Sequence, residues 1–274
     1  MTAENMRQAF VEGISFWAPK LPAWEIAGPV LAGEAAPPVA ALRRPSPQML
    51  PSAERRRAPD SVALAIEVAA RACSAAAQDP ARLPSVFATT HADLEITDYL
   101  CETLVKTPLH TSPTKFHNSV HNAAAGYWCI ATGCHAPYMT VSVFGYSYAV
   151  GLLEAFMQVA GNGIPVLYVA YDIEARGPLA PIAMSRSLLG VGFVLAPNRS
   201  AQSVARLSWS IRPGAKGNAT QAQPGNAGLV EGNAMAPCLP LFEALARSNG
   251  PVTLALGPDS LLDVVVHDVR TLAP

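Results

Sequence analysis

The sequence predicts an α/β domain whose central sheet is covered by helices on both faces. Predicted strands alternate with predicted helices along most of the 274 residues, an order typical of layered α/β folds. The strands are apolar throughout, as in Val166–Tyr171 (VLYVAY), which indicates burial on both faces. The stretch from Phe116 to Leu153 contains no Asp, Glu, Lys or Arg, so it is expected to form the core or a subunit interface.

Composition excludes several classes of protein. Half of the residues are apolar, 14% are charged and the formal net charge is −1, whereas soluble domains usually carry about a quarter charged residues. Disordered chains combine few apolar residues with a high net charge, and nucleic-acid binding needs an excess of Lys and Arg. The composition therefore argues against both classes. His, Asn, Gly and Pro interrupt the charge-free stretch, so no membrane span is predicted. The first ten residues show no signal peptide, which predicts a cytoplasmic protein.

Local patterns predict the elements in order. Residues 1–60 contain nine prolines, so residues 1–50 are expected to be an irregular Pro-rich segment. Asp60 is expected to cap the first long helix, and the basic cluster of Arg55, Arg56 and Arg57 precedes it. The predicted helices and strands are helices 61–77, 94–106, 120–132, 148–160 and 239–247, and strands 85–89, 138–144, 166–171, 191–195, 204–210, 252–255 and 261–266.

Two further expectations concern the C-terminal part. Strands 191–195 and 204–210 are expected to form a hairpin joined through Pro197 and Asn198. Residues 212–237 are rich in Gly, Ala, Asn, Pro and Gln, which indicates a flexible surface loop or insert. The chain is expected to form a single domain over residues 1–274.

The strand–turn–helix at 138–160 is the strongest candidate site. A sharp turn from a strand into a helix exposes a side chain beside the helix N-terminus, where backbone N–H groups stabilise an oxyanion. Here Gly145-Tyr146-Ser147-Tyr148-Ala149 approximates the G-x-S-x-G turn of serine hydrolases. Ser147, Asp172 and His267 follow the chain order of that class. A serine hydrolase of α/β type is therefore an alternative, although Ala149 replaces the last Gly and His267 lies in a predicted strand.

A family resemblance offers another interpretation of the same turn. Ser112–Gly126 (SPTKFHNSVHNAAAG) and Ile130–Pro137 (IATGCHAP) resemble the N-terminal half of a β-ketoacyl synthase, a family with the thiolase fold. Glu54–Ala65 (ERRRAPDSVALA) and Gly192–Leu195 (GFVL) extend the similarity over about residues 50–210. The resemblance implies a thiolase-like layered fold, equivalent to the N-terminal half of a ketosynthase with a short C-terminal addition.

The catalytic groups of that family have no counterparts at the matching positions. The family carries a cysteine at the turn, where this chain has Phe144, Gly145 and Tyr146. Its two catalytic histidines belong to a C-terminal half, and the last 60 residues here contain only His267. Because condensation needs a thiolate, the resemblance implies a degenerate nucleophile turn, a chain without intrinsic activity and no cofactor.

The resemblance also implies a partner. In some type II polyketide-like systems a ketosynthase-like chain without the cysteine is the chain-length factor. The resemblance therefore implies a non-catalytic accessory subunit in fatty-acid-like or aryl polyene (polyketide) biosynthesis. It would form a heterodimer with a catalytic β-ketoacyl-ACP synthase, with acyl carrier protein as a possible further partner. A stand-alone acyl-binding domain is a third possibility. The residues expected at the subunit interface are His117, Asn118, His121, Asn122 and Gly126. His117 and His121 have metal-ligand spacing, but no third ligand is near in sequence, so no metal is predicted.

Overall fold

The computed structural model describes residues 7–183, 185–230 and 232–269. The first six residues, which contribute to the expected absence of a signal peptide, lie outside them. In the described ranges the chain forms an eight-stranded mixed sheet of order β3-β2-β4-β5-β1-β6-β8-β7. Its strands are β1 (Gln8–Trp17), β2 (Ser85–Ala88), β3 (Tyr138–Val141), β4 (Val166–Asp172), β5 (Leu189–Ala196), β6 (Ala205–Pro213), β7 (Gly250–Ala255) and β8 (Ser260–Asp268). The α-helices are α1 (Trp24–Ala32), α2 (Ser52–Arg57), α3 (Asp60–Ala75), α4 (Leu94–Lys106), α5 (Pro113–Asn118), α6 (Ala123–Thr132), α7 (Ser147–Asn162), α8 (Ala180–Ala183), α9 (Pro224–Ala227) and α10 (Leu239–Ala246).

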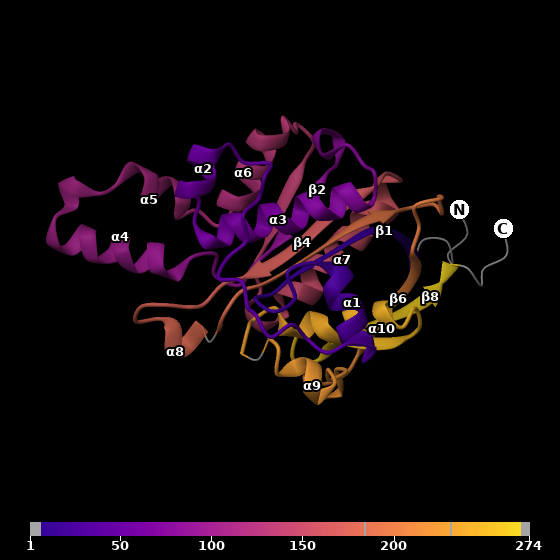
Figure 1. Cartoon of the computed structure of the whole chain (residues 1–274). Coiled ribbons are helices and arrows are strands. Elements are labelled where there is room, and N and C mark those ends of the chain that lie inside the picture. The colour runs from indigo at the N-terminus through magenta and orange to yellow at the C-terminus, as the bar shows by residue number, and fades with distance from the viewer. Residues whose placement is uncertain (1–6, 184, 231, 270–274) are drawn as a thin grey trace.

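Helices cover both faces of the central strands, which confirms the predicted layers (Figure 1). The helices α3 and α6 pack on one face, and α1, α7 and α10 pack on the other. The approach of α3 is close because β1 has Gly13 beneath it, where a Cβ would overlap the carbonyl of Ala72. Ser15 of β1 donates a hydrogen bond of 2.6 Å to the carbonyl of Val68 in α3. Small and polar residues thus fix the helix on the sheet.

The parallel strands β3, β2 and β4 position the candidate site. Their register pairs Ser85 with both Tyr138 and Leu167. The carboxyl ends of all three strands therefore meet at one end of the sheet, where open α/β sheets bind ligands. Ser142, just after β3, donates a hydrogen bond of 2.6 Å to the carbonyl of Thr90, just after β2. The segments after the strands are thus tied to one another.

The N-terminal segment departs most from its prediction. The expectation of irregular structure over 1–50 is wrong in its first part, because β1 is a central strand between β5 and β6, and α1 follows it. Glu12 and Ser15 interrupt its apolar pattern. Both are buried and bonded inside the protein, since Glu12 accepts hydrogen bonds from Gln78 and Ser200. The predicted hairpin is wrong for the same reason, because β5 and β6 each pair with β1 and not with one another.

The segment 212–237 lies against the body of the protein. It contains three short helical turns, η5 (Lys216–Asn218), α9 and η6 (Ala236–Cys238). The buried carboxylate of Glu243 in α10 accepts hydrogen bonds from the Gln223 amide (3.0 Å) and the Asn226 side chain (2.8 Å). The segment also bonds to β7, as the Thr220 amide donates to the Thr253 carbonyl over 2.8 Å. These bonds hold it over the sheet as a wall of irregular structure.

An arm made of α4, η3 (Pro108–His110) and α5 projects from the body in Figure 1. Its exposed apolar side chains include Leu104, Val105, Leu109 and Phe116. No helix in the described part of the chain combines the length and the apolar content needed to cross a bilayer.

Candidate functional site

The turn between β3 and α7 holds Phe144 in a strained conformation. Its backbone φ is +46°, a left-handed value that bulky residues rarely adopt. The side chain is 67% exposed, and its ring meets the ring of His91 edge-on with centroids 5.5 Å apart. In nucleophile turns the strained position carries the exposed reactive side chain. Of the three predicted residues, Phe144 alone has a positive φ, and its phenyl ring is no nucleophile.

Ser147 has a structural role at this turn. Its hydroxyl accepts a hydrogen bond from the amide of Val143 and donates one to the carbonyl of Phe144, each of 2.8 Å. The residue is 1% exposed. The hydroxyl thus closes the turn that holds Phe144 outward, and it is not presented to a substrate.

The serine-hydrolase triad is not assembled, so that alternative is wrong. Strands β4, which ends at Asp172, and β8, which carries His267, are four strand spacings apart, about 19 Å. Following the register through β6, β1 and β5 puts His267 level with the start of β4, the end away from Asp172. His267 also shares a hydrogen bond of 2.9 Å with Ser208. Chain order matched the hydrolase pattern, but strand order separates the residues.

A polar cluster beside Phe144 joins Asp172, predicted only as a member of the hydrolase triad, to Thr90 and His91, which the sequence patterns did not single out. Asp172 accepts hydrogen bonds of 3.1 Å from the amides of Thr90 and Ile173, and burial raises its pKa to about 6. Burial and the nearby His121 both lower the pKa of His91. His91 Nε2 has no hydrogen-bond partner among the described residues. The signal that pointed here was the polar Thr-Thr-His run directly after strand β2.

Two of the five residues expected at an interface contact β3 or the segment after β2. His121 Nε2 lies 3.4 Å from the Thr89 carbonyl, and Asn122 donates a hydrogen bond of 2.9 Å to the Tyr138 hydroxyl. The ring of His117 packs edge-on against Tyr127, with centroids 5.7 Å apart.

The other two expected interface residues differ in exposure. Asn118 is buried and its Oδ1 has no partner among the described residues. Gly126 faces open space, because a Cβ there meets nothing within 4 Å. Of the five residues, His121 and Asn122 are therefore the ones tied directly to β2 and β3.

None of the five cysteines is a residue of the turn. Cys73, Cys134 and Cys238 are buried, Cys129 is half-buried in α6 and Cys101 is exposed on α4. Burial holds the pKa of Cys73 at about 12, so this thiol is inert. Among the described residues, His, Cys, Asp and Glu side chains nowhere gather in threes that could hold a metal ion.

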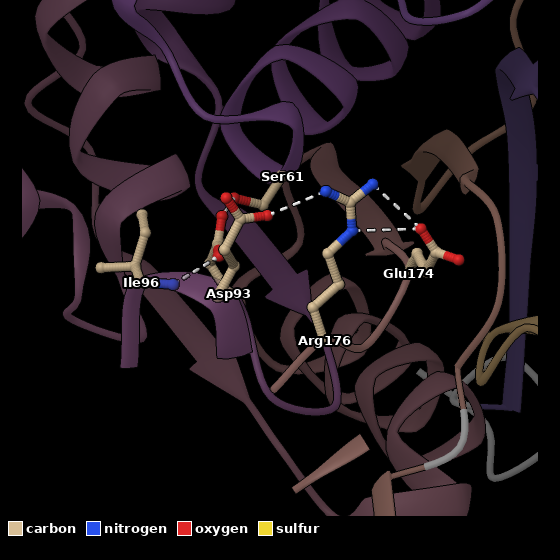
Figure 2. Close-up of polar contacts among 6 residues, drawn as sticks. Ser61, Asp93, Ile96, Glu174 and Arg176 are labelled. Carbon is tan, nitrogen blue, oxygen red and sulfur yellow. Dashed lines mark hydrogen bonds and ion pairs between the residues drawn. The ribbon is translucent and has the colours of Figure 1, made fainter. Parts of the chain in front are cut away.

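A polar cavity of about 610 Å³ opens between the arm and the start of α3. Figure 2 shows its acidic side, where Asp93 accepts a hydrogen bond of 3.0 Å from the Ile96 amide at the start of α4. Arg176 forms ion pairs with Glu95 (3.2 Å) and Glu174 (3.0 Å). The lining also includes Arg43, Arg57 and Lys115. Neither Arg43 nor Arg57 forms an ion pair within the described ranges, so both bring positive charge without an ion-pair partner to the cavity.

Comparison with solved structures identifies the fold. The ketosynthase ApeO in complex with its chain length factor ApeC from Xenorhabdus doucetiae matches with a TM-score of 0.69 and 19% identity over 94% of this chain and 99% of the other. The ishigamide ketosynthase/chain length factor matches with a TM-score of 0.68 and 14% identity over 96% and 99%. AntDE:AntF, a type II polyketide synthase acyl carrier protein in complex with its ketosynthase, matches with a TM-score of 0.72 and 11% identity over 96% and 99%. These likenesses show the thiolase-like fold that the sequence predicts.

Sequence comparison adds the family. No curated protein matches the chain in sequence. The family described as β-ketoacyl synthase, N-terminal domain, matches residues 31–247, which is most of the chain. That range includes the turn with Phe144, the polar cluster and the interface residues. The chain therefore belongs to the β-ketoacyl synthase family, of which it carries the N-terminal domain.

Proposed function

We propose that this chain is a non-catalytic, chain-length-factor-like subunit that pairs with a catalytic β-ketoacyl-ACP synthase in fatty-acid-like or aryl polyene (polyketide) biosynthesis. The observation that carries the proposal is Phe144, an exposed aromatic side chain at the strained position of the nucleophile turn. A left-handed Phe costs about 1–2 kcal/mol relative to relaxed backbone. The fold keeps the turn while its reactive position holds a group that cannot accept an acyl chain.

The surroundings of Phe144 supply no substitute nucleophile. Ser147 is buried with its hydroxyl bonded on both sides. Cys238, near Tyr148, is buried and its pKa is raised by that burial, and the Thr90 hydroxyl beside His91 is also buried. His91 and Asp172 are acid–base groups, but acyl transfer through them still needs a thiol or hydroxyl to hold the chain. An aromatic ring at this point suits a different task, because it can form the wall or the end of an apolar tunnel that receives a growing chain.

The open edge strand β3 supports a subunit partner. It pairs only with β2, and its Tyr138 and Met139 side chains are 41% and 44% exposed. Ser85 and Thr89 donate to the carbonyls of Pro137 and Val141. Because such groups alternate along a strand, the N–H groups of Tyr138 and Thr140 face away from β2. An edge with free N–H groups and apolar side chains is a template for pairing with another chain.

The exposed apolar side chains beside β3 extend this surface. Ile130 of α6 and Phe144 at the turn are both more than half exposed. Exposed apolar residues that gather at a free sheet edge are typical of protein interfaces. The ApeO–ApeC and ishigamide structures are likewise ketosynthases with chain length factors, and their fold match supports a synthase as the partner.

An acyl carrier protein is the proposed further partner. The cluster Arg55, Arg56 and Arg57 lies in α2 at the rim of the polar cavity, which Arg57 lines. Such unpaired guanidinium groups attract an acidic protein surface. The AntDE:AntF structure, which matches in fold, holds a ketosynthase with its acyl carrier protein.

The test is co-expression with a full-length β-ketoacyl synthase and an acyl carrier protein from the same organism. We expect the two ketosynthase-like chains to co-purify and to extend acyl chains together, whereas this chain alone is inactive. Phe144→Cys in the isolated chain should not create condensing activity, because the catalytic histidines have no counterparts. Phe144→Ala in the complex should change the length of the product, whereas Phe116→Ala on the arm serves as an exposed-aromatic control.

Two outcomes would contradict the proposal. One is condensing activity in the isolated chain, wild type or Phe144→Cys. The other is purification as a free chain in the presence of every synthase of that organism. If a fluorophosphonate probe labels the wild type and does not label Ser147→Ala, the chain is a serine hydrolase and the proposal is wrong.

A further inference from the structure

A second cavity lies behind the nucleophile turn, on the side of the sheet that α7 and α10 cover. Its volume is about 360 Å³, in the size range of small-molecule sites, roughly 300–1,000 Å³. It is enclosed by the turn, segment 216–222, the start of α10 and strand β7. Its apolar lining includes Ala149, Ala222, Leu239, Leu254 and Ala255.

The polar side chains of this cavity are already engaged, except for one ammonium group. Thr253 donates to Asp263 over 2.6 Å, and Thr220 accepts from the Thr253 amide over 2.9 Å. Gln221 donates to the Ala219 carbonyl over 3.1 Å. The exception is Lys216, whose Nζ lies 5.2 Å from the centroid of the Tyr146 ring. No carboxylate is among the lining residues, and Lys216 forms no ion pair with any residue of the described ranges.

The ammonium group is held at the mouth of the cavity. A Cβ on Gly145 would lie 4.0 Å from Lys216 Nζ, so the lysine covers the backbone of the turn. Its own backbone is fixed, because the Lys216 amide donates to the Pro258 carbonyl over 2.9 Å. The first turns of α7 and α10 contribute Ala149 and Leu239 to the lining, and helix N-termini add positive potential. The cavity thus combines an apolar interior with a positive rim.

We propose that this cavity binds a free monocarboxylic acid with a medium-length apolar tail. The tail would occupy the space between β7, α10 and segment 216–222, and the carboxylate would pair with Lys216. A neutral ester, thioester or alcohol with the same tail lacks the charge that Lys216 recognises. The inference does not rest on the proposed function, because the cavity is complete within this chain and needs no partner subunit.

Calorimetric titration of the full chain with octanoate, and with octan-1-ol as the uncharged tail, tests the site. We expect one octanoate to bind per chain, at least tenfold more tightly than octan-1-ol. Lys216→Met should lower the affinity for octanoate at least tenfold and leave that for octan-1-ol unchanged. Lys20→Met, at an exposed lysine outside the cavity, is the matched control and should behave as wild type.

Ala255→Phe fills the apolar interior and should abolish binding of both ligands. Because Lys216 is exposed, the Lys216→Met protein is expected to fold. Its octanoate affinity therefore tests the inference even if Ala255→Phe does not fold. Equal affinity of the wild type for octanoate and octan-1-ol, no octanoate binding, or an unchanged ratio in Lys216→Met would overturn the inference. Co-purification with a synthase is a separate readout that Lys216→Met should leave intact.

Discussion

The two edge strands of the sheet, β7 and β3, differ in whether another part of the chain covers them. At one edge, β7 begins Gly250-Pro251. The Thr220 amide of the overlying segment donates to the Thr253 carbonyl, and the Thr253 amide donates to the Thr220 hydroxyl oxygen. Proline and a covering loop are two ways in which proteins close a sheet edge. At the other edge, β3 has no proline within it, no covering segment in the described ranges and exposed apolar side chains. The chain closes one edge itself and leaves the other open, and the open edge is the one that we propose pairs with a partner.

The difference between the edges predicts that substitutions at β7 affect the stability of the subunit, whereas substitutions at β3 affect its assembly with a partner. At the β7 edge the covering segment is held by hydrogen bonds within the chain, so loss of those bonds is expected to destabilise the subunit. Residues at the β3 edge bond on one side only, so changes there are expected to leave the subunit folded and to remove a partner. Four predictions test this division.

The largest expected effect is at the closed edge. Glu243→Ala removes the buried acceptor that holds the Gln223 amide and the Asn226 side chain. It should lower the free energy of unfolding by about 3–4 kcal/mol, because two buried donors lose their partner and a cavity is left. Denaturant unfolding measures this. Glu243→Gln keeps an acceptor oxygen and should cost less than half as much; equal losses in the two variants would show that the hydrogen bonds are not the cause.

At the open edge the expected effect is on assembly. The N–H of Thr140 points away from β2, so Thr140→Pro removes a donor from the open edge and leaves the bonds to β2 in place. We expect the variant to pair with the synthase about a hundredfold more weakly, a loss of about 2.7 kcal/mol. Its melting temperature should stay near that of the wild type. Pull-down titration measures the pairing, and Pro251→Glu at the β7 edge is the control that should pair normally. If both variants pair normally, β3 is not the interface.

A smaller effect is expected from pH at the site between the edges. The pKa of Asp172 is raised to about 6 by burial, above about 3.9 in the unfolded chain. The folded state therefore binds more protons between these values, so the contribution of Asp172 to stability is present at low pH and lost as pH rises from about 4 to about 6. The wild type should lose about 2 kcal/mol relative to Asp172→Asn across that window. Urea unfolding at each pH measures this, and parallel curves would contradict it.

The smallest effect concerns the strained turn. Phe144→Gly relieves the left-handed backbone, and because the ring is exposed, little packing is lost. The variant should be more stable by about 0.5–1 kcal/mol while changing the product length of the complex. Phe144→Leu keeps both the side-chain bulk and the strain and should match the wild type in stability. A destabilised Phe144→Gly would show that the ring is packed in the subunit itself.

The sequence predicted the continuous apolar strands of the core, but it did not predict β1, whose apolar pattern is interrupted by buried polar residues. Val166–Tyr171 was predicted as a central strand because a short, continuous apolar run is typical of a strand buried on both faces. Gln8–Trp17 was missed because Glu12 and Ser15 look like surface residues until their tertiary partners are known. The error then spread, since a hairpin of β5 and β6 is the natural expectation when the strand between them is not recognised.

At the site, sequence identified the turn but not its geometry. Three neighbouring residues were candidates for the reactive position, and only the positive φ of Phe144 separates them. Ser147, Asp172 and His267 satisfied a chain-order pattern that carries no information about strand order. His91 and Thr90 drew no attention because a polar run after a strand is ordinary until the packing puts it beside Phe144.

The most direct test of the account is native mass spectrometry of this 28.7 kDa chain co-expressed with a full-length β-ketoacyl synthase of the same organism. We expect a complex of one chain of each kind for the wild type, and separate chains for Thr140→Pro at the same concentration. A wild-type chain that remains alone beside the synthase, or a Thr140→Pro chain that pairs as the wild type does, would contradict the claim that the open β3 edge serves a catalytic partner.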